Sequence, residues 1–218
     1  MNLNDVRFAP FPVLGKRYKP NDYHAIDLDR SHLERIGIST ANELQIHLQQ
    51  KSNDWECVLY GGYLEHRALY QDSPLFNSAT EKRDIHLGID LWQVAGHPIF
   101  APLDGEIHSL RYNDQELDYG YTLIISHQVK HLRFNTLYGH LSDSIMDLWT
   151  VGQPVSRGNV IGHLGDMDQN GGWIPHVHLQ LILDMTGYHG DYPGVCSEKD
   201  VMFYQSNCPD PTPILILG

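Results

Sequence analysis

The chain has 218 residues, enough for one domain of ordinary size with a substantial appendage, and 41% of them are hydrophobic, which is enough for a core. Its formal net charge of −12 argues against nucleic acid, anionic membrane surfaces and polyanionic cell wall as electrostatic partners. No apolar run approaches the length of a membrane span, so no membrane partner is expected.

The start of the chain carries no recognisable secretory signal, because residues 1–7 lack a basic start followed by an apolar stretch. A cytoplasmic location is therefore expected, unless export uses another route or a signal segment has been removed. The cysteines Cys57, Cys196 and Cys208 are far apart in sequence, which does not fit a disulfide framework or a cysteine zinc site. We expect them to be reduced, buried thiols.

Residues 1–54 differ in composition from the rest of the chain and are predicted to form an N-terminal extension with short helices. Residues 55–218 are predicted to form the main domain. Within the extension, residues 7–23 are rich in proline and aromatic residues and are predicted to lie extended across the surface.

Two capping boxes predict the helices of this extension. They are Ser31 with Glu34, for a helix through Ile36, and Thr40 with Glu43, for a helix to about Lys51. The second helix carries Ala41, Leu44 and Leu48 on one face. Two interpretations remain open: the helices cover a sheet edge, or they wall one side of a groove or mediate dimerisation.

Residues 57–60 are predicted to form a strand before Gly61 and Gly62. Residues 84–91 read Asp-Ile-His-Leu-Gly-Ile-Asp-Leu. If they form one strand, His86, Gly88 and Asp90 share one face and three aliphatic residues share the other. An imidazole and a carboxylate on either side of a residue without a side chain leave room for a metal ion, and both groups suit zinc.

From Ile85 onward, short turn-bounded segments rich in Val, Ile, Leu and aromatic residues predict strands. These segments are 97–102, 105–112, 121–127, 134–138, 154–161 and 175–183. The pattern favours an antiparallel β-sandwich or folded sheet, so the fold class is predicted to be mainly β. Between two of the strands, residues 113–119 form an acidic loop that we interpret as a solvated hairpin tip.

A second candidate for metal binding lies in residues 175–182. His176, His178 and Gln180 alternate there with three apolar residues, which predicts a strand with one polar and one apolar face. His140 is expected at the end of another strand, in residues 136–141. The chain has 14 histidines, so some pair by chance; those without such partners are interpreted as surface or hydrogen-bonded residues, namely His24, His32, His47, His66, His97, His108, His127, His131, His163 and His189.

Three motifs together resemble the LytM/lysostaphin-type zinc metallopeptidases. They are His86-x-x-x-Asp90, Leu137-Tyr-Gly-His140 and His176-x-His178. The motifs occur in the same order as in this family, with residues 101–105 after the first motif and residues 151–158 before the last. The similarity covers about residues 85–183. The flanking residues 61–67, 190–194 and 209–211 resemble more closely the branch found in large proteins that also carry phosphotransferase and class III aminotransferase domains.

The resemblance implies a fold, a metal and a set of site residues. The fold would be the folded antiparallel sheet of this family, the duplicated hybrid motif, with a groove over it. Zinc would be the cofactor, with His86, Asp90 and His178 as metal ligands. His140 and His176 would be the catalytic residues that do not bind the metal. One would accept a proton and the other would orient water or stabilise the oxyanion; the sequence leaves open which histidine has which role. No His-Glu-x-x-His helix is present to supply a glutamate base.

Segments beside the motifs are expected to shape the groove. In some relatives the segment before the first ligand lies over the metal, and residues 61–83 occupy that place here; the alternative is an ordered loop with a local ion pair. Residues 165–173 are predicted to form one groove wall. After His178 the family commonly has Phe-Glu, where this chain has Leu179 and Gln180.

The resemblance implies a zinc endopeptidase with a peptide or muropeptide substrate, such as a peptidoglycan-type cross-link or a glycine-containing peptide. Two alternatives remain open: a non-catalytic zinc-binding recognition module, and a zinc amidohydrolase acting on a cytoplasmic peptide. The acidic charge is unusual for an enzyme that lyses bulk cell wall. Neither nucleic acid nor membrane is an expected partner, and the oligomeric state stays open.

Overall fold

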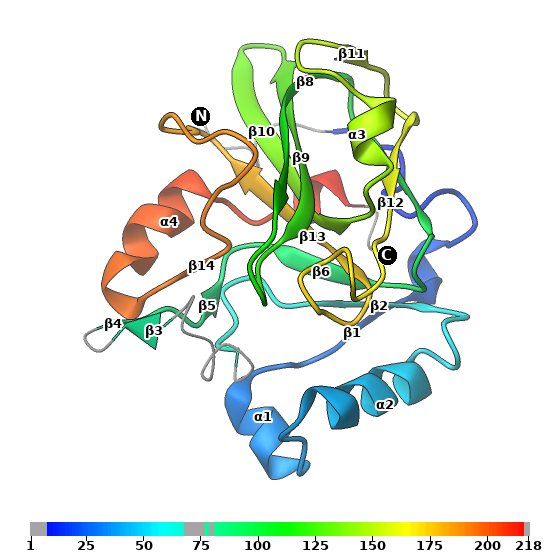
Figure 1. The fold of residues 1–218 in the computed structure, drawn as a ribbon, viewed down its shortest axis with the longest axis vertical. Helices are drawn as coiled ribbons and strands as arrows, with labels where there is room; N and C mark the ends of the chain where they lie inside the picture. Colours follow the sequence, from blue (N-terminus) through cyan, green and yellow to red (C-terminus); the bar gives the residue numbers. More distant parts are fainter. Residues whose placement is uncertain (1–7, 68–76, 79–80, 216–218) are drawn as a thin grey trace.

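The computed structural model describes residues 8–67, 77–78 and 81–215. Its centre is an eight-stranded sheet in the order β1-β2-β6-β13-β10-β9-β8-β11, in which only the β1–β2 pair is parallel (Figure 1). The strands of this sheet are β1 (Tyr23–Ala25), β2 (Val58–Gly61), β6 (Ile89–Trp92), β8 (Gly105–Asn113), β9 (Gly120–Val129), β10 (Leu132–Leu141), β11 (Pro154–Val155) and β13 (His176–Ile182). The predicted mainly β fold with an antiparallel sheet is therefore confirmed.

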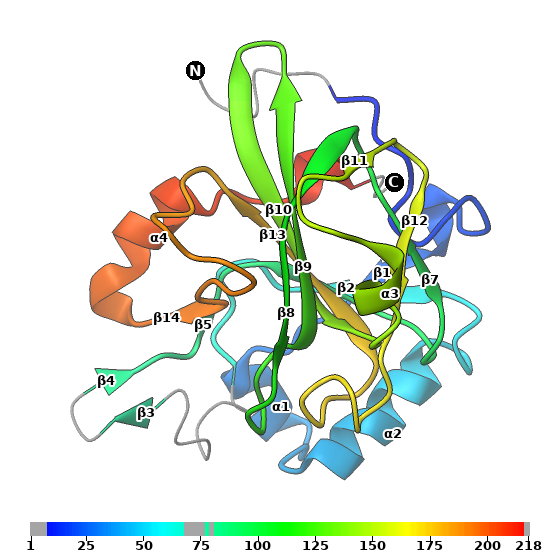
Figure 2. The same ribbon diagram turned by 45° about the horizontal axis from the view of Figure 1, so that its top comes forward.

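Smaller elements surround the sheet. Among the described residues there are three two-stranded sheets. They pair β7 (Pro98–Phe100) with β12 (Val160–His163), β5 (Ile85–His86) with β14 (Val195–Cys196), and β3 (Asn77–Ser78) with β4 (Glu81–Lys82). The α-helices are α1 (Arg30–Arg35), α2 (Ala41–Lys51), α3 (Ile145–Leu148) and α4 (Val201–Asn207). In Figures 1 and 2, α1 and α2 lie beyond the β1–β2 edge of the sheet, and α4 lies beside β14. None of the helices among the described residues has the length and apolar character needed to cross a membrane.

Both faces of the sheet are buried, because alternate residues of the central strands enter different clusters. Leu123 and Ile125 belong to a first core, whereas Ile124 between them belongs to a second core. In β13 the apolar residues Val177, Leu179 and Leu181 all enter the first core. The polar residues between them therefore face the side of the second core.

The segment 84–91 is not one strand, so the prediction that its alternate residues share one strand face is wrong. β5 ends at His86 and β6 begins at Ile89. Leu87 packs in the second core and Ile89 in the first, so the chain crosses from one core to the other at Gly88. A Cβ atom on Gly88 would lie 2.7 Å from the His178 ring, which explains why a residue without a side chain occupies the crossing.

The N-terminal extension joins the body of the protein more closely than expected. Instead of lying across the surface, the segment 8–23 places Val13, Leu14 and Tyr18 in the first core. The capping box of Thr40 and Glu43 is confirmed, since both of its hydrogen bonds are present at the start of α2. The cap of α1 is Asp29, not the predicted Ser31, because the Asp29 carboxylate accepts the Ser31 backbone N–H.

One further expectation is corrected in the C-terminal half. The predicted strand 154–161 is two short strands, β11 and β12, separated by a turn at residues 156–159. After Pro209, Thr212–Ile214 form a single 3-10 turn whose Ile214 packs into the first core. Cys57, Cys196 and Cys208 are free thiols in the described structure; Cys196 and Cys208 are buried as expected, whereas Cys57 is only half-buried.

Candidate metal centre and its groove

The candidate centre is built on a row of residues that face one another across four strands. Asp90 of β6 pairs with His178 of β13, Gly61 of β2 pairs with Asp90 on its other side, and Gly139 of β10 pairs with His178. Directly paired residues in neighbouring strands hold their side chains close together. The glycines at the ends of the row allow close packing: a Cβ atom on Gly139 would clash with the Tyr119 ring, and one on Gly61 would clash with the Ile26 carbonyl oxygen.

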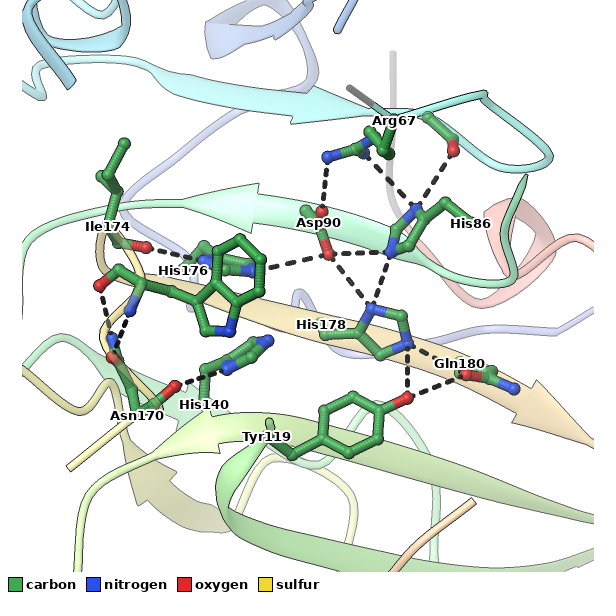
Figure 3. A network of polar contacts seen from close by, with 12 residues as sticks. Arg67, His86, Asp90, Tyr119, His140, Asn170, Ile174, His176, His178 and Gln180 are labelled. Carbon is green, nitrogen blue, oxygen red and sulfur yellow. Dashed lines mark hydrogen bonds and ion pairs between the residues drawn. The ribbon is translucent and has the colours of Figure 1, made fainter. Parts of the chain in front are cut away.

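Three potential ligand atoms converge at this row (Figure 3). The His86 Nε2 atom lies 2.8 Å from His178 Nδ1 and 3.3 Å from Asp90 Oδ1, and His178 Nδ1 lies 3.2 Å from Asp90 Oδ1. All three residues are at most 3% exposed. Among the described His, Cys, Asp and Glu residues, these three form the group whose ligand atoms all lie within 4.8 Å of one another.

The shortest outer hydrogen bond of each of the two histidines indicates its tautomer. His86 Nδ1 lies 3.1 Å from the Gly62 carbonyl oxygen, and His178 Nε2 lies 2.9 Å from Gln180 Oε1. Each of these nitrogens can only donate to a carbonyl oxygen, so the inner nitrogens are left with lone pairs. Because burial lowers the pKa of His86 to about 4, that imidazole is neutral at pH 7.

These donors fit zinc. Two imidazole lone pairs and a carboxylate oxygen in mutual contact repel one another unless a cation lies between them. Ligand atoms about 2.0–2.1 Å from a tetrahedral zinc ion lie about 3.3–3.4 Å from one another. The distances from Asp90 Oδ1 to the two histidine nitrogens match this separation, whereas the distance between the two nitrogens is shorter. Outer hydrogen bonds from both histidines to carbonyl oxygens are the usual support of metal-binding imidazoles.

Arg67 supports the centre from the side of β2. Its Nη1 atom lies 3.1 Å from Asp90 Oδ2, and its Nε atom lies 2.6 Å from Glu65 Oε2. Burial acts to raise the pKa of Asp90, but the electrostatic interactions of its carboxylate with His86, His176 and Arg67 outweigh burial and hold that pKa well below its usual range. Since Arg67 engages Oδ2, the Oδ1 atom alone faces the two histidines, which favours binding of a metal through one oxygen.

We expect Arg67→Met to destabilise the zinc-free protein by about 3–5 kcal/mol, because removing one partner leaves the buried Glu65 and Asp90 carboxylates without their cation. Urea unfolding of chelator-treated protein measures this change. The double variant Arg67→Met/Glu65→Gln should recover part of the loss, since one of the two uncompensated charges is gone. Unfolding of Arg67→Met within about 1 kcal/mol of the wild type would contradict a supporting role.

His140 and His176 lie beside the triangle without joining it. Their ring centroids are 4.3 Å apart, and His176 Nε2 is 3.7 Å from Asp90 Oδ1. His140 Nδ1 donates to the Asn170 carbonyl at 2.9 Å and His176 Nδ1 donates to the Ile174 carbonyl at 2.6 Å, so Nε2 is the acceptor in both rings. Burial lowers the pKa of His140 well below its ordinary value and also lowers that of His176. Both rings are therefore neutral proton acceptors at pH 7.

A β-bulge aims His140 at the centre. The register between β10 and β9 shifts between Tyr138 and Leu141, and His140 has a positive φ of 63°. Bulges of this kind turn one side chain out of the regular alternation. The structure thus brings together all five predicted site residues, whose individual roles as ligand or catalyst stay predictions.

Tyr119 is a site residue that the sequence did not reveal. Its hydroxyl lies 3.4 Å from His178 Nε2 and 3.5 Å from Gln180 Oε1, and its ring packs against His140. The interpretation of 113–119 as a solvated hairpin tip is therefore wrong for its last residues. Trp173 Nε1 donates to the Asp118 carbonyl, and Leu117 N donates to the Gly171 carbonyl, so this loop is joined to the segment 165–173.

Two cavities meet over the centre and together form the groove. The first, which we call the tyrosine cavity, has a volume of about 230 Å³ and is lined by His178 together with Arg83, Asp118, Tyr119, Tyr188, Asp191 and Tyr192, among others. The second, which we call the α2 cavity, has a volume of about 450 Å³ and contains Asp90 and His176. Leu117, His140 and Trp173 line both, so the triangle and the two unligated histidines lie between the two halves of the groove.

The predicted groove walls can now be compared with the structure. The segment 165–173 is a wall as predicted, since Met167, Gly172 and Trp173 line the α2 cavity. In the segment 61–83, the described residues Gly62 and Arg67 contact the centre and Arg83 lines the tyrosine cavity, whereas residues 68–76 and 79–80 lie outside the described residues. Helix α2 contributes Asn42, Leu44 and Gln45 to the α2 cavity, which favours the groove-wall interpretation of the extension over a simple edge cover.

Comparison with known proteins gives one family match. Residues 84–189 match Peptidase family M23. Similar solved structures include a zinc-containing peptidase from Vibrio cholerae (26% identity, covering 56% of this chain and 33% of that one, TM-score 0.39). A second is lysostaphin from Staphylococcus simulans (20% identity, covering 56% of this chain and 44% of that one, TM-score 0.38). A third is LytU (25% identity, covering 67% of this chain and 85% of that one, TM-score 0.38). The chain thus spans less than half the length of the first two. No curated protein matches it.

Proposed function

We propose that this chain hydrolyses peptide bonds inside extended peptides, because its residues 84–189 match Peptidase family M23. The domain is by class a zinc-dependent hydrolase. The candidate substrates are peptidoglycan-type cross-link peptides and glycine-containing peptides, the class implied by the resemblance of the three motifs.

One observation carries the proposal: a triangle of metal-binding atoms lies beside two buried, neutral histidines in the middle of a groove. A groove with a cavity on each side of the centre suits a chain that continues past the reacting bond in both directions. A recognition module that only bound zinc and peptide would have no use for two proton acceptors held by backbone carbonyls.

The chemistry divides between the metal and the protein. Zinc held by His86, Asp90 and His178 would polarise the scissile carbonyl and lower the pKa of water. His140 and His176 each present Nε2 toward the cavity, where one accepts a proton from the attacking water and returns it to the departing amine. Trp92 stacks on His176 at 5.6 Å between ring centroids and holds that imidazole in place.

The narrower family branch is also part of the proposal. We infer that the chain is related to the domain found beside phosphotransferase and class III aminotransferase domains. In support, two of the three segments that carry this resemblance lie at the site: Gly62 and Arg67 in 61–67, and Asp191 and Tyr192 in 190–194. The net charge of −12 favours short soluble peptides over bulk wall polymer as substrates.

The test is cleavage profiling of the zinc-loaded protein against a peptide library that includes muropeptides, with products identified by mass spectrometry. We expect internal cleavage of some members and none after chelation, with recovery on adding zinc. If no member is cleaved, but a peptide or glycan binds in the groove, the recognition-module alternative replaces the peptidase.

A further inference from the structure

The α2 cavity differs in character from the tyrosine cavity. Its walls away from the centre are mainly apolar and come from the N-terminal extension, from β6 and from the segment before β13; they include Leu28, Leu44, Trp92, Met167, Trp173 and Ile174. The tyrosine cavity instead carries three tyrosines, two aspartates and an arginine. The two sides of the centre therefore offer different surroundings to the two sides of a bound peptide.

The apolar wall is firmly held. Leu28, Leu44, Trp92 and Ile174 belong to one buried cluster, in which Leu44 is 3% exposed. The capping box at Thr40 begins the helix that carries Leu44. A wall that is buried and packed in this way keeps its shape when a ligand enters, so selective binding does not require it to be ordered first.

This wall is also joined to the metal triangle. The Leu28 backbone N–H donates to Glu65 Oε1 at 2.7 Å, Glu65 pairs with Arg67, and Arg67 pairs with Asp90. Trp92, which also lines the cavity, stacks on His176. The apolar wall and the reacting groups therefore have a fixed relative position, as a pocket next to a scissile bond requires.

We propose that the α2 cavity is a specificity pocket for an apolar side chain of the substrate, on the side of the scissile bond that faces α2. Its lining offers little to a charged group, because the arginine and aspartate among its residues are paired with each other. The cleavage part of this proposal rests on the proposed function, whereas the binding part does not.

The experiment uses hexaglycine and its single-leucine variants, each with the leucine at a different position. With the zinc-loaded protein, we expect kcat/KM for the best leucine peptide to exceed that of hexaglycine by about tenfold or more, the usual discrimination of an apolar pocket. Leu44→Ala should reduce this ratio by about fourfold or more, the contribution of at least one buried methylene.

The control is Leu48→Ala. Leu48 lies one turn further along α2 and belongs to the same buried cluster, but it does not line the cavity. This variant should lose stability as Leu44→Ala does while keeping the wild-type preference for leucine. An equal fall of the ratio in both variants would overturn the pocket, because it would trace the effect to general loosening of α2.

A second readout keeps the pocket and the proposed function separable. In zinc-free protein, the best-binding leucine peptide should shift the indole N–H NMR signals of Trp92 and Trp173, and not those of Trp55 and Trp149, and hexaglycine should bind more weakly. Such binding without any cleavage after zinc loading would support the pocket and count against the peptidase. Equal binding of all peptides, or binding only by a soluble muropeptide glycan, would overturn the pocket.

Discussion

Asp90→Ala should lose zinc almost completely, with affinity reduced by at least about 100-fold, because one ligand of three is removed and the two histidines lose the negative charge between them. Metal analysis of protein purified without chelator should give about one zinc per chain for the wild type and a small fraction of that for the variant. Chelator competition gives the affinities.

Asp84→Ala is the matched control. Asp84 lies six residues before Asp90 and pairs with Lys82 and His66 outside the triangle. Its replacement should leave the zinc content unchanged. If the double variant His86→Ala/Asp90→Ala retains stoichiometric zinc, the metal binds elsewhere and the assignment of all three ligands is wrong.

His140→Ala and His176→Ala should each keep zinc and lose at least about 100-fold in kcat, since general acid–base catalysis contributes about 10²–10⁴-fold. Both side chains lie beside the triangle, so neither variant removes one of its ligand atoms. Single-turnover assays on the best library peptide, combined with metal analysis of the same samples, measure the two properties together.

His127→Ala controls for the loss of a buried histidine. His127 is 3% exposed and hydrogen bonded to the Asp104 carbonyl and to Thr136, away from the groove. Its replacement should lower stability without the loss of kcat. Wild-type turnover by both His140→Ala and His176→Ala would show that the mechanism is wrong even though the metal is bound.

The sequence predicted best what a local pattern encodes. In β13, alternation of polar and apolar residues correctly separated His176, His178 and Gln180 from the leucines of the first core. The capping box of Thr40 and Glu43 is equally local, because all its atoms lie within four residues. The three motifs also pointed to the peptidase family whose model residues 84–189 match.

Features that depend on contacts between distant segments could not be predicted. Tyr119 reaches His178 across 59 residues of sequence, and Leu28 reaches Glu65 across 37. No periodicity within either segment encodes such a meeting, which arises only when the sheet brings them together. The crossing at Gly88 was missed for a related reason, because the ring that needs its space belongs to His178.

Alternate residues of strand β13 face the groove and the first core, and this alternation determines where the protein can change in length. Insertion or deletion of one residue between His176 and Ile182 would exchange the two faces, turning histidines into the first core and leucines into the groove. Such a change cannot be accommodated gradually, because all the residues beyond it reverse together. Diversity in this architecture must therefore accumulate in connecting loops such as 165–173, where added or lost residues reshape the groove while the strand that carries the histidines keeps its length.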